Sequence, residues 1–328
     1  MDIGRRSFFK VLSAGAMAVA VSEPIHAREA HTLDSDAMGI LYDATLCIGC
    51  KACEVACKNE NNMPTEHDTP AEIAAGVSGI WDSGGDLNAK TLNKIKVYKN
   101  GSALHKDQEI DGYSFIKRAC MHCVDPACVS ACPATALTKT EGNGIVKWNA
   151  DACIGCRYCQ IACPFNIPKF EWDDPTPAIV KCELCSHKTE KGGLPGCTEK
   201  CPTGASLFGK TKDLLKEAER RMSLKAGESY NYPVKSLYSN ETQSHVIAEY
   251  NGEVYGDKEG GGTQNLYLAG VGFDKLGLPD LPEYSAAKKS ETLQHRLYKG
   301  MIAPAILLGG LVTAAYKTSK SDEEGSEV

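Results

Sequence analysis

Apolar residues along this chain form one stretch near each end and only short patterned runs between them. In the interior, alternating apolar and polar positions predict short strands, and one amphipathic run predicts a helix. The predicted strands are 113–117, 136–140, 145–148 and 205–209, and the predicted helix is 211–224. Short strands mixed with small helices predict an α+β fold.

Glycine-rich segments predict where the chain turns. The Glu-Gly-Asn-Gly sequence at 141–144 joins two of the predicted strands as a hairpin turn, and 76–85 predicts a loop. Glu259 precedes three consecutive glycines, a run that could cradle a phosphate. The run lacks the lysine and Ser or Thr of a nucleotide site, so it predicts a flexible turn instead.

The N-terminal apolar stretch has the features of an export signal. An arginine pair at positions 5 and 6 precedes Phe8, an apolar run follows over 11–21, and Ala27 ends a small-residue cleavage site. This order resembles a twin-arginine signal rather than an ordinary secretory signal. The twin-arginine route exports folded proteins, so such a chain can receive metal before export. We therefore exclude residues 1–27 from the mature fold.

The C-terminal apolar stretch, 297–316, is predicted to be a transmembrane helix. Its uninterrupted core is 301–315, and Lys299 and Lys317 can extend toward the membrane surfaces, which gives about the 20 residues that a bilayer needs. A buried core helix is the alternative, but the stretch has no polar face. Combined with the export signal, this helix places the body outside the cytoplasmic membrane and the tail, 317–328, inside.

Composition and charge narrow the class of function. The 328-residue chain has a net charge of −6, which argues against a nucleic-acid partner because such partners require a basic face. Aromatic residues make up only 7% of the chain, so a large apolar core is not the obvious source of stability for the fold. The sixteen cysteines indicate disulfides, structural metal or iron–sulfur clusters.

These cysteines fall into four groups of four, with none left over. Groups one and three have the Cys-x2-Cys-x2-Cys-x3-Cys spacing of bacterial ferredoxins, and groups two and four lengthen one interval. In chain order the groups are Cys47, Cys50, Cys53, Cys57; Cys120, Cys123, Cys128, Cys132; Cys153, Cys156, Cys159, Cys163; and Cys182, Cys185, Cys197, Cys201.

This spacing suits a cluster of four irons and four sulfides. Three cysteines of a short loop surround one face of the cluster, and backbone amides of the loop donate hydrogen bonds to its sulfurs. The fourth cysteine points away, and in two-cluster ferredoxins it binds the other cluster. A proline follows it at Pro133, Pro164 and Pro202, whereas Lys58 stands there in group one.

Disulfides and zinc are the alternatives to clusters. Disulfides occur in exported proteins, but four such runs with three Cys-Pro endings form an unusual disulfide framework. Zinc prefers separated Cys-x2-Cys pairs, a pattern that group four alone could fit. His122 and His187 lie beside predicted ligands, and we expect them to have supporting or surface roles because cysteines already fill sixteen positions. No catalytic triad, carboxylate pair or nucleotide motif stands out, so no catalytic residue is predicted.

In this order, the groups resemble the four-cluster electron-transfer subunits of membrane-bound respiratory oxidoreductases. That family includes the iron–sulfur subunits of formate dehydrogenase, nitrate reductase and dimethyl sulfoxide reductase. The resemblance covers essentially the whole chain and is closer to the iron–sulfur subunits of membrane-bound nickel–iron hydrogenases. The stretches that carry it are 41–43, 46–47, 120–126, 153–163, 192–197, 259–264 and 294–301.

The resemblance implies a duplicated bacterial-ferredoxin-like α+β domain over 28–225. Groups two and three, at about 111–170, would form an inner lobe and groups one and four an outer lobe, with two 4Fe-4S clusters in each lobe and four in all. A C-terminal extension, 226–296, would lead to the transmembrane helix. The implied ligation is crossed between groups: Cys47, Cys50 and Cys53 with Cys201; Cys182, Cys185 and Cys197 with Cys57; Cys120, Cys123 and Cys128 with Cys163; and Cys153, Cys156 and Cys159 with Cys132.

The resemblance also implies a function and partners. The chain would be a non-catalytic subunit that takes electrons from a periplasmic nickel–iron hydrogenase and passes them to an integral membrane subunit that reduces quinone. The alternative is the same role for a formate dehydrogenase or another molybdopterin oxidoreductase. A cluster-binding sensor or scaffold without electron flow is a third hypothesis. The expected location is the periplasmic side of the cytoplasmic membrane.

Overall fold

The computed structural model describes residues 30–64, 86–172 and 179–324 of the chain. Residues 30–287 form one body, and the segment from 288 onward belongs to a second unit that is described by itself. The predicted export signal, 1–27, and all of the predicted loop at 76–85 lie outside the described residues.

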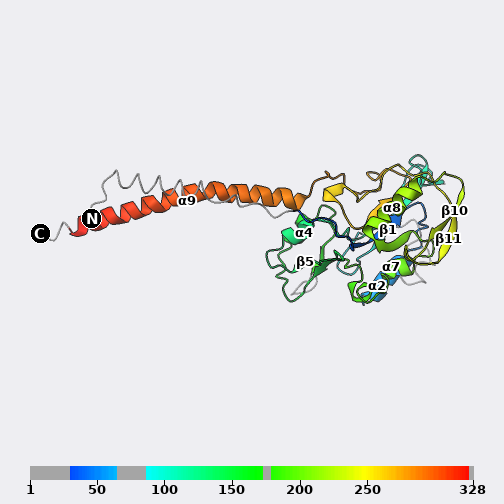
Figure 1. Ribbon diagram of the computed structural model, residues 1–328, viewed down its shortest axis with the longest axis horizontal. Coiled ribbons are helices and arrows are strands. Elements are labelled where there is room, and N and C mark those ends of the chain that lie inside the picture. The colour runs from blue at the N-terminus through cyan, green and yellow to red at the C-terminus, as the bar shows by residue number, and fades with distance from the viewer. Residues whose placement is uncertain (1–29, 65–85, 173–178, 325–328) are drawn as a thin grey trace. The chain divides into compact units, whose positions relative to one another are not determined.

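A three-stranded sheet lies in the middle of the body. Its central strand β1, Met38–Asp43, pairs antiparallel with β9, Ser206–Lys210, and parallel with β12, Leu266–Leu268. Successive side chains of a strand point to opposite faces. Helix α8, Thr211–Met222, packs against β1 (Figure 1). Leu41 therefore joins a buried cluster with residues of α8, while its neighbours in β1 face the larger core on the other side.

The segment predicted as a C-terminal extension contributes to this body. It supplies β12 to the central sheet, although more than 200 residues separate β12 from β1. Upstream of β12, a polar hairpin forms from β10, Ser229–Pro233, and β11, Thr242–Val246. The Glu259 run is a short 3-10 turn, η1, Glu259–Gly261, which agrees with the predicted turn.

Groups one and four of cysteines lie on helices that pack together. Helix α2, Ala52–Glu60, follows the group-one loop and packs against α7, Gly196–Glu199, in group four. A second three-stranded sheet lies near them and contains the predicted strand 113–117. Its strands, in order across the sheet, are β2, Lys94–Lys99; β4, Gly112–Arg118; and β3, His105–Lys106.

Groups two and three likewise lie on helices that pack together, α4, Ala127–Ser130, and α5, Tyr158–Ala162. The predicted hairpin between these groups is confirmed, since β5 and β6 pair antiparallel. The remaining elements here are short. They are too short to be stable alone, so packing against the rest of the body stabilises them. The bounds are β5, Leu137–Lys139; β6, Val146–Trp148; β7, Lys169–Phe170; β8, Ile179–Val180; and, further on, α6, Ser186–Thr189.

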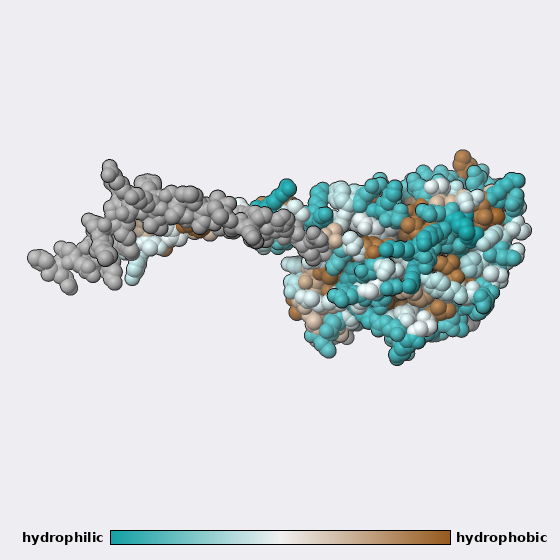
Figure 2. Space-filling model, viewed as in Figure 1, coloured by the Kyte–Doolittle hydropathy of each residue, from teal (hydrophilic) through white to brown (hydrophobic). Residues whose placement is uncertain are grey.

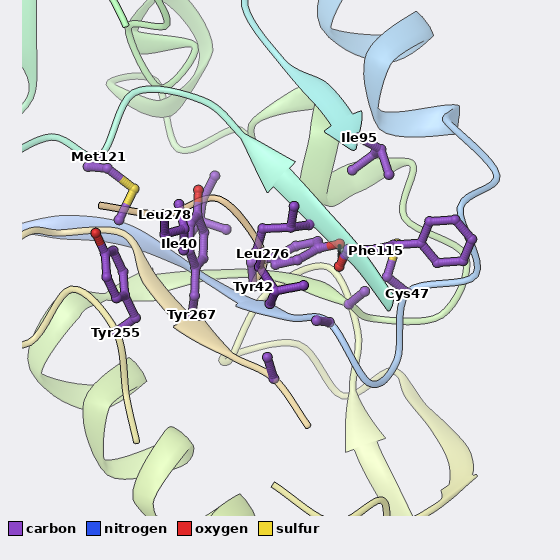
Figure 3. Close-up of a cluster of buried hydrophobic side chains, with 14 of the residues drawn as sticks. Ile40, Tyr42, Cys47, Ile95, Phe115, Met121, Tyr255, Tyr267, Leu276 and Leu278 are labelled. Atoms are coloured by element: carbon purple, nitrogen blue, oxygen red, sulfur yellow. Dashed lines mark hydrogen bonds between the residues drawn. The ribbon is translucent and has the colours of Figure 1, made fainter. Parts of the chain in front are cut away.

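Aromatic residues and cysteines share the main core (Figure 3). Tyr42 meets Tyr267 edge to face, and its hydroxyl donates a 3.0 Å hydrogen bond to the carbonyl of Phe115. Cys47 and several other cysteines are among the buried residues of the same core. The face of the body shown in Figure 2 is mostly hydrophilic, with scattered apolar residues. Several of the predicted cluster ligands are therefore part of the apolar interior.

Helix α9, Ala286–Glu324, contains the predicted transmembrane segment and extends beyond it at both ends. Among the described residues, no helix has both the length and the apolar character that crossing a membrane requires. The structure therefore does not support the predicted transmembrane helix over 297–316. Of the predicted tail, 325–328 lie outside the described residues.

Candidate metal centres

All sixteen cysteines lie within the described residues, and all have free thiols. None of them forms the disulfides considered from the sequence. Cys50 and Cys156 are exposed, and the other fourteen are buried or partly buried. Each exposed cysteine is the second of a Cys-x2-Cys-x2-Cys loop, so two of the loops come to the surface of the body.

One cavity gathers four cysteines from two different groups. The cysteines that line it are Cys132 of group two and Cys153, Cys156 and Cys159 of group three.

A second cavity gathers four more cysteines, again from two groups. Lys117 and three asparagines also line it. One of these, Asn61, directs its amide nitrogen at the sulfur of Cys57 from 3.7 Å. The cysteines of this cavity are Cys57 of group one and Cys182, Cys185 and Cys197 of group four.

Most of the remaining eight cysteines are related through their effects on one another's pKa. Burial raises the pKa of Cys123, and the nearby thiolate charges of Cys163, Cys120 and Cys128 raise it further. Burial also raises the pKa of Cys47, to about 11, and Cys201 adds to this rise. The fourth cysteine of group three thus lies near the group-two loop, and the fourth of group four near the group-one loop.

These sets differ from a site for one metal ion. Zinc–sulfur bonds of about 2.3 Å bring tetrahedral sulfurs within roughly 4 Å of each other. In the described part of the chain, no three His, Cys, Asp or Glu side chains gather closely enough to hold a single ion. Four thiols that line one cavity without gathering around a single point, with amides directed at the sulfurs, fit a polynuclear cluster.

Left-handed backbone turns direct amides toward the cysteines. In groups one and three, Gly49 and Gly155 have φ of 71° and 66°, and the residues two further on, Lys51 and Arg157, have φ of 59° and 64°. Alternating handedness of this kind lines up successive N–H groups into a concave site for anions, as in iron–sulfur loops. The amide of Gly49 accordingly lies 3.4 Å from the sulfur of Cys47.

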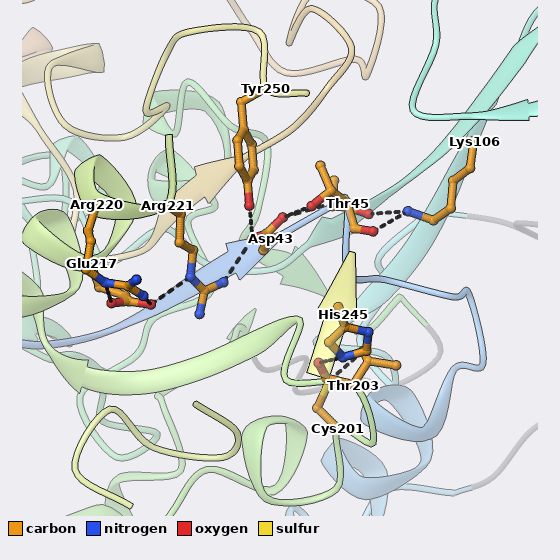
Figure 4. A network of polar contacts seen from close by, with 11 residues as sticks. Asp43, Thr45, Lys106, Cys201, Thr203, Glu217, Arg220, Arg221, His245 and Tyr250 are labelled. Carbon is orange, nitrogen blue, oxygen red and sulfur yellow. Dashed lines mark hydrogen bonds and ion pairs between the residues drawn. The ribbon is translucent and has the colours of Figure 1, made fainter. Parts of the chain in front are cut away.

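A buried polar network holds the start of the group-one loop (Figure 4). Arg221, fully buried, forms a 2.9 Å ion pair with Asp43 at the end of β1, and the hydroxyl of Tyr250 donates to the same carboxylate. Asp43 in turn accepts a 2.6 Å bond from Thr45, whose carbonyl accepts from Lys106. The backbone leading to Cys47 is therefore fixed by side chains from three distant segments.

The glycine run and the residues after it hold the group-two loop. Thr263 forms a β-bridge with Cys123, and the amide of Asn265 donates a 2.6 Å bond to the carbonyl of Cys120. The adjacent Gln264 accepts a bond from Lys139 at 2.6 Å. The run thus turns the chain so that these side chains reach the cysteine loop, a role that its sequence did not indicate.

The two histidines beside the cysteines have the expected supporting and surface roles. His122 is fully buried, and its Nδ1 accepts a 3.2 Å hydrogen bond from the amide of Val146 in β6. Burial lowers the pKa of His122, so the ring is neutral and can accept this bond. His187 lies on α6 with an exposed side chain.

Comparison of the sequence with known proteins shows which proteins this chain is similar to. Residues 112–211 match the family described as the 4Fe-4S dicluster domain. The hydrogenase-2 operon protein HybA of Escherichia coli O157:H7 is 43% identical over 326 residues, which cover 98% of this chain and 97% of that protein.

Formate dehydrogenase subunits are more distant relatives. The iron–sulfur subunit of the nitrate-inducible formate dehydrogenase of Escherichia coli K12 is 32% identical over 278 residues, 84% of this chain and 81% of that protein. The formate dehydrogenase iron–sulfur subunit of Haemophilus influenzae is 32% identical over 281 residues, 84% and 77% of the two chains.

Proposed function

Because this chain belongs to the family of electron-transfer iron–sulfur subunits of respiratory oxidoreductases, we propose that it connects a nickel–iron hydrogenase to a quinone-reducing membrane subunit. In this role it is the counterpart of the hydrogenase-2 operon protein. Its similarity to that relative is higher and extends over more of both chains than its similarity to the formate dehydrogenase subunits.

The proposed cofactors are four 4Fe-4S clusters in two lobes, each of which accepts and gives one electron at a time. The observation that carries this proposal is that each of two cavities is lined by four cysteines, three from one group and one from another. The packing of α2 on α7 and of α4 on α5 is the arrangement that crossed ligation needs. The sixteen cysteines hold iron in the crossed sets given above, and the loop amides and buried lysines offset the negative charge of the thiolates.

We further propose that the chain performs no bond-making chemistry. The hydrogenase small and large subunits oxidise hydrogen, and the integral membrane subunit reduces quinone. For electron transfer, this chain needs only to hold its clusters at fixed positions and to set their reduction potentials. Loops held by buried networks, such as Asp43 with Arg221, meet the first requirement.

The proposed location is the periplasmic side of the cytoplasmic membrane. The arginine pair at positions 5 and 6 and the apolar run that follows support export by the twin-arginine route. That route accepts folded proteins, so clusters can be inserted in the reducing cytoplasm before export. A fusion of residues 1–40 to a reporter exported only when folded tests this, and loss of export on Arg5→Lys with Arg6→Lys is the expected result.

A formate dehydrogenase or another molybdopterin enzyme is the alternative donor, and the formate dehydrogenase relatives favour it. Deletion of this chain, with quinone reduction measured in membranes supplied with hydrogen or with formate, separates the two donors. We expect hydrogen-dependent reduction to be lost, formate-dependent reduction to persist, and the intact gene to restore the former. Loss of the formate activity alone would contradict the hydrogenase assignment.

A further inference from the structure

Lys117 is a buried cation beside the proposed cluster sites. It lies near the end of β4, its side chain is only 2% exposed, and it lines the cavity that holds Cys197 and its three partner cysteines. Its ammonium donates a 3.2 Å hydrogen bond to the hydroxyl of Ser206, which is itself 1% exposed. Burying a charge in this way is costly unless an opposite charge compensates it.

When the cysteines bind metal as thiolates, the compensating charges come from two different ligand sets. Burial alone lowers the pKa of Lys117, but the charges of Cys197 and Cys53 outweigh burial and raise the pKa above its usual value. Cys53 belongs to the set with Cys201, whereas Cys197 belongs to the set with Cys57. Among the described residues, no ion pair joins Lys117 to a carboxylate. The ammonium therefore lines the cavity of one proposed cluster and is within electrostatic reach of Cys53, a proposed ligand of the other.

Two other lysines near the cysteines, Lys139 and Lys181, make different contacts. Lys139 donates to the carbonyls of Cys123 and Gly144 and to Gln264, and Lys181 donates to two backbone carbonyls. The hydrogen bonds of both ammonium groups hold the backbone in place. Lys117 has one hydroxyl partner, so more of its charge acts on the sulfurs around it.

We propose that Lys117 raises the reduction potentials of the two clusters of the outer lobe and so keeps both reducible while they lie close together. This inference rests on the proposed function, since it requires clusters in both sets. Reduction adds one electron to one cluster and removes one from its donor cluster, with no bond or proton change. A fixed positive charge in a weakly polarisable interior favours the reduced, more negative state.

The test is a redox titration of the anaerobically purified full chain, followed by electron paramagnetic resonance, with iron and sulfide assayed in every sample. Lys117→Met removes the charge at similar size, and Lys117→Arg keeps it. Lys216→Met is the matched control, because it removes one positive charge from a side chain that is 76% exposed on α8. Ser206→Asp neutralises the charge of Lys117 without removing the lysine.

We expect Lys117→Met to lower the reduced-to-oxidised ratio of at least one outer-lobe cluster about tenfold at fixed ambient potential, which is about 59 mV for a one-electron couple. Lys117→Arg and Lys216→Met should titrate like the parent chain. If Lys117→Met does not retain iron, Ser206→Asp becomes the deciding variant. We expect it also to lower the reduction potential of at least one outer-lobe cluster. Fully loaded Lys117→Met or Ser206→Asp with unchanged potentials overturns the inference, whereas a parent chain without iron and sulfide overturns the proposed function itself.

Discussion

Buried thiols are the residues on which this account depends most. Burial raises the pKa of Cys159 to about 11 and that of Cys128 to about 12, with nearby cysteines adding to the rise. At neutral pH such thiols stay protonated unless a cation binds them. Cluster assembly therefore releases protons and supplies the positive charge that lets thiolates lie together in the interior, which couples metal binding to folding.

Cys163 distinguishes crossed ligation from ligation within each group. We expect Cys163→Ser to eliminate the cluster held by Cys120, Cys123 and Cys128, because the charge of Cys163 acts on these thiols. The measurement is electron paramagnetic resonance of reduced, anaerobically purified variants. The signals lost in Cys163→Ser should equal those lost in Cys123→Ser.

The control for this comparison is Cys153→Ser, which removes a group-three ligand from the first cavity. Its missing signals should differ from those of Cys163→Ser. Crossed ligation is wrong if Cys163→Ser and Cys153→Ser lose the same cluster while the Cys123→Ser signal survives.

The sequence predicted the candidate ligands but not the residues that hold their loops in place. Cysteine spacing is local, so all sixteen positions could be found by counting along the chain. Asn265 and Cys120 are 145 positions apart, and Arg221 and Asp43 are 178 apart. Only the folded chain brings such partners together. Lys117 resembles an ordinary strand residue in the sequence, and only its burial sets it apart.

Among the elements, strand periodicity predicted β4, β5, β6 and β9 within one or two residues, and the amphipathic pattern predicted α8. Three helices, α4, α6 and α7, have four residues each, too short to show a helical period. The parallel pairing of β12 with β1 was also missed, because pairing between strands so distant in sequence leaves no local signal.

The central sheet requires glycine where β1 passes the segment before β12. A Cβ added at Gly39 would lie 1.8 Å from the backbone oxygen of Gln264, which cannot move without disturbing the group-two support. We expect Gly39→Val to destabilise the chain by about 3 kcal/mol and to lower the temperature at which cluster absorbance is lost by roughly 10 °C.

Gly209→Ala is the matched control, because Gly209 pairs with Gly39 in the same sheet. A Cβ there meets side-chain atoms of Leu214 and Leu237 at 3.3 Å, and side chains can adjust. We expect it to shift the temperature only slightly. Equal shifts for the two variants would mean that contact between β1 and the 263–265 segment does not limit stability.

At the scale of the molecule, cysteine groups far apart in sequence meet in pairs. The outer groups meet where α2 packs on α7, and the inner groups meet where α4 packs on α5. Several cysteines belong to the buried cores, so clusters would complete the interior as well as carry electrons. The order of the groups predicted an α+β ferredoxin-like domain. The length of the body, to residue 287, depends on β12 and could not be predicted.

Iron and acid-labile sulfide per chain test the central claim most directly. The sample is the anaerobically purified full chain, quantified together with zinc and examined by Mössbauer spectroscopy. The account predicts about sixteen irons and about sixteen sulfides per chain, four of each per cluster. A chain that is folded and supports hydrogen-dependent quinone reduction with zinc in place of iron, or with no metal, would contradict it.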